Sequence, residues 1–309
     1  RCDAITCEFE NVPAASLALL EQHKPVRPAA SAVRVCQDRR EEKAFLTRAG
    51  VPVAPNLTLL PHEPLPALSS DLFPAILKTA REGYDGKGQW TIHQASELPA
   101  ALAASGVPCV LEKRLPLEGE FALTLARSPS GAISALPLVQ NWHSGGILDQ
   151  TRSPANVPAL EAEAQRIAEH IIAALDYVGV LTVEFFLVGG QLLVNEMAPR
   201  PHNSGHPSID NAGCSQFELQ VRALCDLPLP AQADVQPAIL LNLLGDLWQD
   251  GTPDWAGALA LPGVHLHLYG KCEARPGRKM GHVTVTGRDW PTVEATAHQL
   301  RALLGLTPR

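Results

Sequence analysis

Residues Val180 to Ala198 read VLTVEFFLVGGQLLVNEMA, and this stretch decides the fold. Two runs of β-branched, aromatic and apolar residues flank Gly189-Gly190, which is a strong signal for a β-hairpin. Each run carries one glutamate, Glu184 in the first and Glu196 in the second. Where these two carboxylates lie relative to each other depends on the length of the turn.

A two-residue turn at Gly189-Gly190 would set Glu184 across from Asn195 and send Glu196 to the opposite face, because side chains alternate along a strand. A three-residue loop that includes Gln191, with a glycine in the left-handed conformation, would set the two glutamates directly across from each other. We expect the three-residue loop. Two carboxylates that close repel unless a hard cation lies between them, and Mg²⁺ favours one or two carboxylates plus phosphate oxygens. The alternative is a surface hairpin whose glutamates only face water.

The segment Asn195 to Gly213, NEMAPRPHNSGHPSIDNAG, overlaps the end of this hairpin. It contains Glu196, one arginine, two histidines and several small polar side chains. A core strand or a solvated loop seldom needs such a density of polar groups. We therefore interpret the segment as part of a functional site.

Length and composition indicate a globular protein of two or three domains. The chain has 309 residues, of which 46% are hydrophobic and 18% charged. Its net charge of −7 and its pI near 5.9 argue against general nucleic-acid binding, which needs a basic face. Any anionic ligand must therefore be held by lysines and arginines that gather locally.

The seven cysteines are scattered and form no CxxC pair, so neither a disulfide framework nor a zinc site is indicated. We expect buried thiols in a reducing cytoplasm. No signal peptide is evident, and no apolar run approaches the length of a membrane span. The sequence thus predicts a cytoplasmic protein without nucleic-acid or membrane partners.

The N-terminal part predicts a strand at Cys2 to Phe9, a helix at Ala14 to His23 and a second helix at Ser31 to Ala49 with a serine cap. The chain opens on a strand with no element before it, which suggests a parallel-sheet domain that has lost its first units. In the second helix, Gln37-Asp38-Arg39 and Lys43 are either solvated polar residues, the commoner case, or ligand contacts.

An apolar strand, Leu72 to Thr79, contains Lys78 and precedes the glycine-rich segment GYDGKG at Gly83 to Gly88. Three glycines in six residues let backbone N–H groups approach phosphate oxygens. The segment is not a Walker A motif, because it lacks the GK[ST] ending. A plain hairpin turn is an equally good interpretation, although a lysine near the end of an apolar run favours a nearby anion.

Further along, Val107 to Leu111 is a short strand that leads into a linker, Glu112 to Leu115, of the kind that reads adenine through its backbone. Glu112 and Glu120 are candidates for the ribose hydroxyls, and His143 precedes a glycine loop. Helices are expected at Leu160 to Leu175 and Ser215 to Cys225. A cationic cluster in the last part is either a solvated face or a phosphate clamp; it consists of Lys271, Arg275, Arg278 and Lys279.

Taken together, these stretches resemble the N5-carboxyaminoimidazole ribonucleotide synthases, ATP-grasp ligases of purine biosynthesis. The resemblance covers essentially the whole chain. PRPHNSGH and RKMGH are specific to this family, whereas the glycine loop and the paired glutamates are common to ATP-grasp enzymes. The motifs that carry it are EFENVP (8–13), QDRREEK (37–43), GYDGKGQ (83–89), EKRLPLEGE (112–120), NWHSGGIL (141–148), NEMAPRPHNSGH (195–206), YGK (269–271) and RPGRKMGH (275–282).

Carried over by position, the resemblance implies a mobile phosphate loop at 83–89 and an Mg²⁺ ion on Glu184 and Glu196. The implied ATP site consists of Arg39, Lys78, Gly83, Tyr84, Asp85, Gly86, Lys87, Gly88, Gln89, Glu112, Lys113, Arg114, Leu115, Glu120, His143, Asn195 and Glu196. The implied ribonucleotide site consists of Tyr84, Asp85, Arg200, His202, Lys271 and Arg278. Four of these are the candidate catalytic residues, namely Asp85, Arg200, Lys271 and Arg278.

The implied fold class is α/β and α+β multidomain, an ATP-grasp fold with an incomplete N-terminal parallel α/β domain and a small β-rich C-terminal domain. The expected boundaries are 1–57, 58–236 and 237–309. The implied reaction joins bicarbonate to 5-aminoimidazole ribonucleotide at the expense of ATP, through carboxyphosphate, in a homodimeric enzyme. Two alternatives are another ATP-grasp ligase, dependent on formate or biotin, and a non-catalytic ATP-binding module. Cys7 stands where the family usually has an aromatic residue, and the family's glycine-rich first unit precedes the point where this sequence begins.

Overall fold

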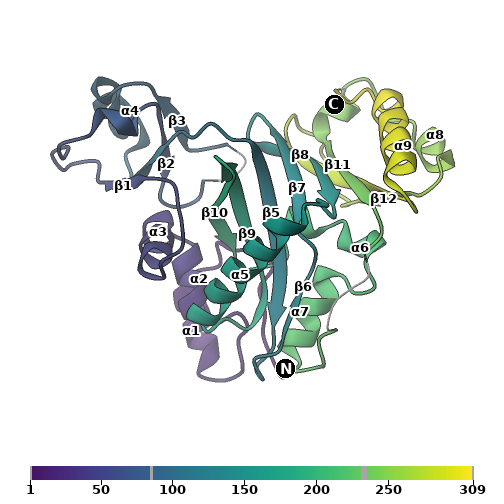
Figure 1. Ribbon diagram of the computed structural model, residues 1–309, viewed down its shortest axis with the longest axis horizontal. Helices are drawn as coiled ribbons and strands as arrows, with labels where there is room; N and C mark the ends of the chain where they lie inside the picture. Colours follow the sequence, from purple (N-terminus) through teal and green to yellow (C-terminus); the bar gives the residue numbers. More distant parts are fainter. Residues whose placement is uncertain (1, 84–85, 231–234, 308–309) are drawn as a thin grey trace.

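The computed structural model describes residues 2–83, 86–230 and 235–307. Figure 1 shows the arrangement of the elements. The helices are α1 (Ala14–Glu21), α2 (Ala30–Cys36), α3 (Arg39–Arg48), α4 (Leu98–Ser105), α5 (Pro158–Ala174), α6 (Ser208–Asn211), α7 (Gln216–Leu224), α8 (Trp255–Ala260) and α9 (Trp290–Leu303). The strands are β1 (Asn56–Leu59), β2 (Ala75–Thr79), β3 (Gln89–Ile92), β4 (Cys109–Lys113), β5 (Gly119–Arg127), β6 (Ile133–Ala135), β7 (Val139–Ser144), β8 (Ile147–Ser153), β9 (Gly179–Val188), β10 (Gln191–Ala198), β11 (Ala238–Leu244), β12 (Val264–Leu268) and β13 (Lys279–Thr286).

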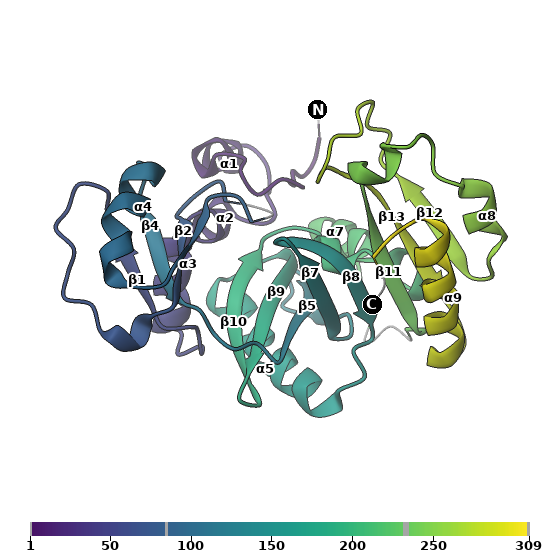
Figure 2. The same ribbon diagram turned by 90° about the horizontal axis from the view of Figure 1, so that it is seen from above.

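Two sheets organise these elements. A four-stranded sheet has the order β1-β4-β2-β3, and with α4 it forms a separate lobe (Figure 2). A nine-stranded sheet runs β10-β9-β5-β7-β8-β11-β13-β12, with β6 paired to β5. Because β8 pairs with β11, the C-terminal strands continue the central sheet. The C-terminal lobe, which contains β11, β12 and β13, is therefore built on the end of the long sheet, and the four-stranded sheet forms the other lobe. This is the mixed helix and sheet architecture that the sequence predicted.

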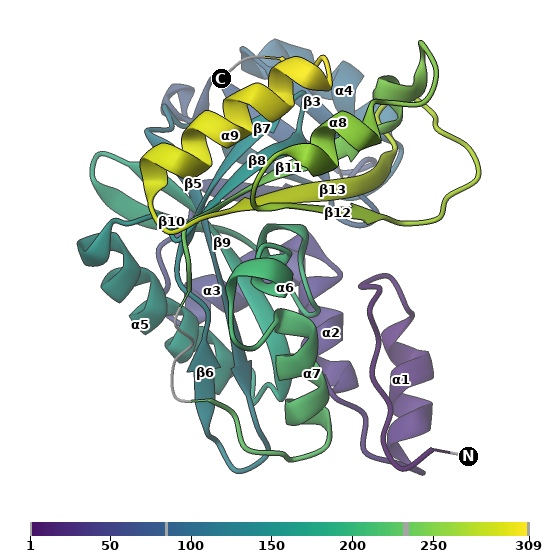
Figure 3. The same ribbon diagram turned by 90° about the vertical axis from the view of Figure 1, so that its right-hand side faces the viewer.

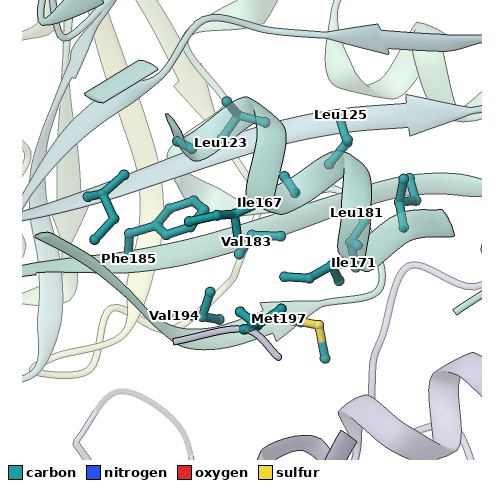
Figure 4. Close-up of a cluster of buried hydrophobic side chains, with 14 of the residues drawn as sticks. Leu123, Leu125, Ile167, Ile171, Leu181, Val183, Phe185, Val194 and Met197 are labelled. Carbon is teal, nitrogen blue, oxygen red and sulfur yellow. The ribbon is translucent and has the colours of Figure 1, made fainter. Parts of the chain in front are cut away.

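The largest core lies between α5 and the central strands. Ile167 and Ile171 of α5 pack against Leu123, Val183 and Phe185 of the sheet (Figure 4). All five side chains are buried, and each contributes roughly 1.5–3 kcal/mol by leaving water. The helix predicted at Leu160 to Leu175 is therefore confirmed, and it packs on the sheet through an apolar stripe. It fixes the central strands that carry the glutamates.

A second core stabilises the C-terminal lobe. Val293 and Leu300 of α9 pack on Leu241 of β11 and Val283 of β13. Figure 3 shows α8 and α9 on one side of these strands and α6 on the other. The opposite face of β12 and β13 is thus left to meet the polar segment around α6.

The central hairpin shows that the predicted turn length is wrong, although the predicted pairing of the two glutamates is confirmed. Gln191 pairs with Val188, so the turn has two residues, Gly189 and Gly190, and not the three that we expected. Both glycines have positive φ, +57° and +73°, which is the turn that matches strand twist and needs glycine. A β-bulge then follows between Val194 and Glu196 and inserts one extra residue. The bulge restores the pairing of Glu196 with Glu184.

The N-terminal part differs more from the sequence-based expectation. Residues 2–9 form no strand; Ile5 makes a single parallel bridge with Val26. The helix expected at 31–49 is divided into α2 and α3. The division occurs because the Asp38 side chain accepts the N–H of Arg40 and begins a new helix. The predicted helices that became α1, α5 and α7 are confirmed within a few residues.

Among the described residues, no helix has the length and apolar character that crossing a membrane requires.

Candidate active site

A cavity of about 440 Å³ lies where the N-terminal helices, the central hairpin and β13 meet. Its polar lining comes from segments that are far apart in the sequence. The lining residues are Phe9, Glu10, Asn11, Cys36, Gln37, Arg39, Glu42, Ala80, Arg81, Glu82, Gly83, His143, Leu148, Glu184, Glu196, Met197, Ala198, Arg200, His202, Asn203 and Lys279. Six of the residues predicted for the ATP or ribonucleotide site are therefore brought together here, in addition to Glu184.

Glu184 and Glu196 both line this cavity and are direct cross-strand partners. Arg39 Nη1 lies 2.7 Å from Glu196 Oε2, and His202 Nε2 lies 3.1 Å from Glu184 Oε1. Burial and the neighbouring Glu196 carboxylate raise the pKa of Glu184 above its usual range. Burial also acts to raise the pKa of Glu196, but the Arg39 guanidinium holds it below its usual range. The two carboxylates therefore repel each other, and the Arg39 guanidinium stabilises the charge of Glu196.

These residues fit a bound Mg²⁺ ion. Asn195 is the bulged residue next to Glu196, and its Nδ2 is 3.5 Å from Glu184 Oε2. Its Oδ1 is buried and has no hydrogen-bond partner among the described residues. Two carboxylates and one spare amide oxygen form a hard oxygen donor set, which is what Mg²⁺ requires. A cation there would also relieve the repulsion that raises the pKa of Glu184.

A buried ion network lies beneath the cavity. Lys78 Nζ is 2.9 Å from Glu112 Oε2, and Lys43 Nζ is 3.5 Å from Glu112 Oε1. Lys43 also donates to the carbonyl oxygen of Asn195 at 2.6 Å. Burial acts to raise the pKa of Glu112, but the neighbouring Lys78 and Lys43 lower it below its usual value. The sequence predicted an anion for Lys78, and in the structure this anion is the Glu112 carboxylate.

His143 of β7 pairs with Glu120 of β5. The His143 Nδ1 lies 3.0 Å from Glu120 Oε2. Although burial acts to lower it, the pKa of His143 is raised because Glu120 accepts its hydrogen bond. The proposed ATP-binding roles of these two residues stay predictions, but the structure brings them together beside the cavity.

The glycine-rich segment joins β2 to β3, which pair as a hairpin. Gly83 lines the cavity, whereas Tyr84 and Asp85 lie outside the described residues. Gly86 has φ +75°, and a Cβ there would lie 3.1 Å from the carbonyl oxygen of Gly145. The hairpin interpretation and the ligand interpretation are therefore compatible, because the loop both joins two strands and reaches the cavity.

Among the other predicted ATP-binding residues, Lys87 and Gly88 precede β3, and Gln89 begins it and pairs with Lys78. Lys113 ends β4, and Arg114 and Leu115 follow it. The N–H groups of Lys113 and Arg114 donate to the carbonyl oxygens of Pro55 and Pro74, each at 2.9 Å. These contacts anchor the linker to the neighbouring segments. Its contact with adenine stays a prediction.

The predicted ribonucleotide site is only partly gathered in the cavity. Arg200 and His202 line it, and the Arg200 guanidinium donates to Glu10 Oε2 from Nε at 3.0 Å and from Nη2 at 2.6 Å. Lys271 lies next to the cavity, because its Nζ donates to the carbonyl oxygen of the cavity residue Lys279 at 2.6 Å. Arg278 donates from Nη1 to the carbonyl oxygen of Glu273. Lys279, which the sequence placed only in a general cationic cluster, is the member that lines the cavity.

Sequence reasoning missed two acidic residues of the site. Glu42 is buried, and its Oε1 accepts the N–H of Met197 at 2.6 Å. Burial raises the pKa of Glu42 to about 8. Glu10 pairs with Arg200 across the cavity. The signal was present in EFENVP and QDRREEK, whose acidic residues had no assigned role.

Three family models match the chain. A ribonucleotide synthetase preATP-grasp domain matches residues 1–37, an ATP-grasp domain matches 44–217, and a phosphoribosylaminoimidazole carboxylase C-terminal domain matches 238–296. These ranges follow the N-terminal helices, the central region and the C-terminal lobe.

Curated relatives and solved structures agree with these matches. N5-carboxyaminoimidazole ribonucleotide synthase of Pseudomonas aeruginosa is 41% identical over 98% of this chain and 82% of its own length. The enzyme of that name from Bacillus subtilis is 39% identical over 91% of this chain and 74% of its own length. The crystal structure of N5-carboxyaminoimidazole ribonucleotide synthetase from Thermus thermophilus matches with a TM-score of 0.88 and 38% identity, over 99% of this chain and 83% of the other. The Aspergillus clavatus enzyme in complex with ADP and 5-aminoimidazole ribonucleotide matches with a TM-score of 0.86 and 29% identity, over 98% and 82%.

Proposed function

The chain belongs to the family of N5-carboxyaminoimidazole ribonucleotide synthases, ATP-grasp ligases of purine biosynthesis, and from this premise we propose how its residues divide the work of the reaction. The enzyme uses ATP to join bicarbonate to the exocyclic amine of 5-aminoimidazole ribonucleotide. Its products are the N5-carbamate, ADP and phosphate. The single observation that carries the proposal is the direct pairing of Glu184 with Glu196 at the wall of the cavity.

Glu184 and Glu196 would hold Mg²⁺ beside the terminal phosphates of ATP. The bulged residue Asn195 would supply a further oxygen ligand. When bound, the ion neutralises charge on the phosphate oxygens and keeps the transferred group in line. Arg39 supplies a second positive charge, because its guanidinium lies 2.7 Å from Glu196 and is 14% exposed. It therefore orients Glu196 and can meet a phosphate oxygen at the same time.

In the first step, an oxygen of bicarbonate forms a bond to the γ-phosphorus as the bond to the ADP oxygen breaks. Carboxyphosphate and ADP result. Carboxyphosphate hydrolyses in open water, so the site must exclude water while it exists. Segment 83–89 is suited to this role, because Gly83 lines the cavity and Gly86 lies close to Gly145.

In the second step, the amine nitrogen forms a bond to the carboxyl carbon and releases phosphate. The proton that the amine loses must pass to a base, and the sequence suggests Asp85. Arg200 is suited to hold the carboxyphosphate oxygens, because it lies on the cavity wall and its charge is balanced there by Glu10. Lys271, Arg278 and Lys279 would bind the phosphate of the ribonucleotide, and His202 lines the same cavity as Lys279. The family resemblance adds Tyr84 to the residues that contact this substrate.

An assay of ADP release separates this proposal from the alternatives. Release should require both bicarbonate and 5-aminoimidazole ribonucleotide. Release that depends on formate with glycinamide ribonucleotide, or on biotin, would point to a different ATP-grasp ligase. Stabilisation by ATP without ADP release under any mixture would point to a non-catalytic module.

Three further parts of the proposal rest on the family resemblance. The chain forms a homodimer, which sedimentation equilibrium checks. It works in the cytoplasm, which fractionation checks. Its domains are bounded near 57 and 236, which limited proteolysis checks. The gap between the matched family ranges at 217 and 238 contains the second boundary, whereas the first two ranges change earlier, between 37 and 44.

A further inference from the structure

A cluster of histidines lies outside the site described above, on the face of β12 and β13 that is turned away from α8 and α9. His267 of β12 and His282 of β13 are direct cross-strand partners. Their rings stack with centroids 4.5 Å apart and an interplanar angle of 19°. Asp210 of α6 faces them, and His267 Nε2 lies 2.9 Å from its Oδ2 and 3.1 Å from its Oδ1. Figure 3 shows α6 against this face.

One ring nitrogen in this cluster has no hydrogen-bond partner. His282 is 1% exposed, and its Nδ1 lies 2.8 Å from the hydroxyl oxygen of Tyr269. Its other nitrogen, Nε2, is buried and has no partner among the residues that the structure describes. Asn242 of β11, the cross-strand partner of His282 on the other side, likewise has a buried Oδ1 without a partner in the described part of the chain. Buried polar atoms normally have partners, so these two indicate a missing polar species.

We propose that Asp210, His267 and His282 bind one divalent transition-metal ion of the zinc or cobalt type. One potential ligand atom from each of the three residues lies within 4.8 Å of the others. Two imidazoles and a carboxylate suit Zn²⁺ or Co²⁺ better than Mg²⁺, and they leave a fourth position for water. The Tyr269 hydroxyl contacts Nδ1 of His282, and such a contact to the other ring nitrogen fixes the orientation of a metal-bound histidine.

To bind one ion, the stacked rings must change their relative orientation, because a metal lies in the plane of each imidazole that binds it and the two planes are now only 19° apart. Bonds of about 2.0–2.1 Å at tetrahedral angles bring ligand atoms to roughly 3.3 Å from one another, so a modest approach is needed. His267 can supply it, because its side chain is 31% exposed and β12 is the edge strand of the sheet. The ion would replace the contact between His267 and Asp210 and would join α6 to both C-terminal strands.

The test is a Co²⁺ titration followed by visible absorption, with a Zn²⁺ titration by calorimetry. The protein is freed of metal, its exposed thiols at Cys2, Cys225 and Cys272 are blocked with iodoacetamide, and excess Mg²⁺ occupies the carboxylate pair. We expect one equivalent of Co²⁺ to bind and to give the bands of a four-coordinate site. The readout is independent of turnover, so its failure would leave the proposed function untouched.

Four variants make the test specific. His267→Ala and Asp210→Asn should each weaken binding at least about 100-fold, and Tyr269→Phe about 10-fold to 100-fold. His298→Ala, an exposed histidine on α9, is the matched control and should bind like the wild type. Melting curves show that each variant is folded. Absence of stoichiometric binding, or equal binding by wild type and His267→Ala, would overturn the proposal. Buried water would then be the partner of the unpartnered polar atoms.

Discussion

Glu184 on β9 lies directly across from Glu196 on β10 because Asn195 is inserted between Val194 and Glu196 as a bulge. The two-residue turn at Gly189-Gly190 alone would have paired Glu184 with Asn195 and sent Glu196 to the other face. One extra residue therefore reverses the facing of a functional side chain. The Asn195 amide lies beside Glu184, with its Nδ2 3.5 Å from Glu184 Oε2, and its Oδ1 is buried and available to a ligand.

Replacement of Glu196 by glutamine should abolish turnover and leave the fold intact. The amide keeps the size of the side chain but loses the charge that would bind the metal ion and that pairs with Arg39. We expect kcat to fall by about 100-fold or more. Steady-state ADP release measures the effect, and Glu163→Gln on α5 is the control. Wild-type rates in Glu196→Gln would refute the assignment of the metal ligands.

Replacement of Arg278 by alanine should raise the KM of the ribonucleotide more than the KM of ATP. The guanidinium lies in the cationic segment that continues into Lys279 at the cavity wall. Arg275→Ala is a close control, because this arginine lies three residues earlier, is exposed and pairs with Glu273. Equal changes in both KM values, or equal effects of the two substitutions, would contradict a phosphate-binding role for Arg278.

Lys78 and Glu112 should be energetically coupled. Both are buried and 2.9 Å apart, so Lys78→Met leaves the carboxylate with Lys43 alone and should cost about 3 kcal/mol. The double variant Lys78→Met/Glu112→Gln should be more stable than the sum of the single effects predicts. Urea unfolding of the four proteins gives the coupling free energy. Additivity within about 0.5 kcal/mol would show that the pair does not act as a unit.

Asp38 should give part of the stability a defined dependence on pH. Burial acts to raise its pKa, but hydrogen bonds from Arg40 and Arg81 lower it to about 2. A carboxyl group whose pKa is lower in the folded state adds stability that is present above the unfolded value, near 3.9, and is lost as the pH falls through about 2. Asp38→Asn keeps a helix cap but removes the charge, so it isolates this contribution.

We therefore expect Asp38→Asn to be less stable than the wild type by about 1–2 kcal/mol at pH 7. The difference should be the same at pH 5.5 and should shrink below about pH 4.5. Urea unfolding at a series of pH values measures it. A difference that stays constant down to pH 3 would show that the charge of Asp38 is not the cause.

Local sequence patterns predicted most of the architecture. The apolar stripe of α5 and the glycine pair of the central hairpin specify their structures through neighbours in the sequence. The site was harder to predict because it depends on contacts between distant residues. The buried network around Glu112 joins residues 43, 78 and 112, and no local sequence pattern predicts these contacts.

Two specific errors show where local reasoning ended. The bulge at Asn195 depends on the packing of β10 against β9 and Val53, which the sequence of the strand does not reveal. The break between α2 and α3 depends on Asp38, which is as compatible with a helix surface as with a cap. In both cases a polar residue determines the path of the backbone: Asn195 forms the bulge and Asp38 begins a helix. The neighbouring residues in the sequence are compatible with either outcome.

The most direct test of the central claim is an anomalous diffraction measurement on crystals grown with ADP and Mn²⁺ as a substitute for Mg²⁺. The account predicts an anomalous peak between Glu184 and Glu196, about 2.2 Å from a carboxylate oxygen of each and in contact with a phosphate oxygen of ADP. A peak that touches neither carboxylate, or carboxylates that point away from a bound ion elsewhere in the cavity, would contradict it.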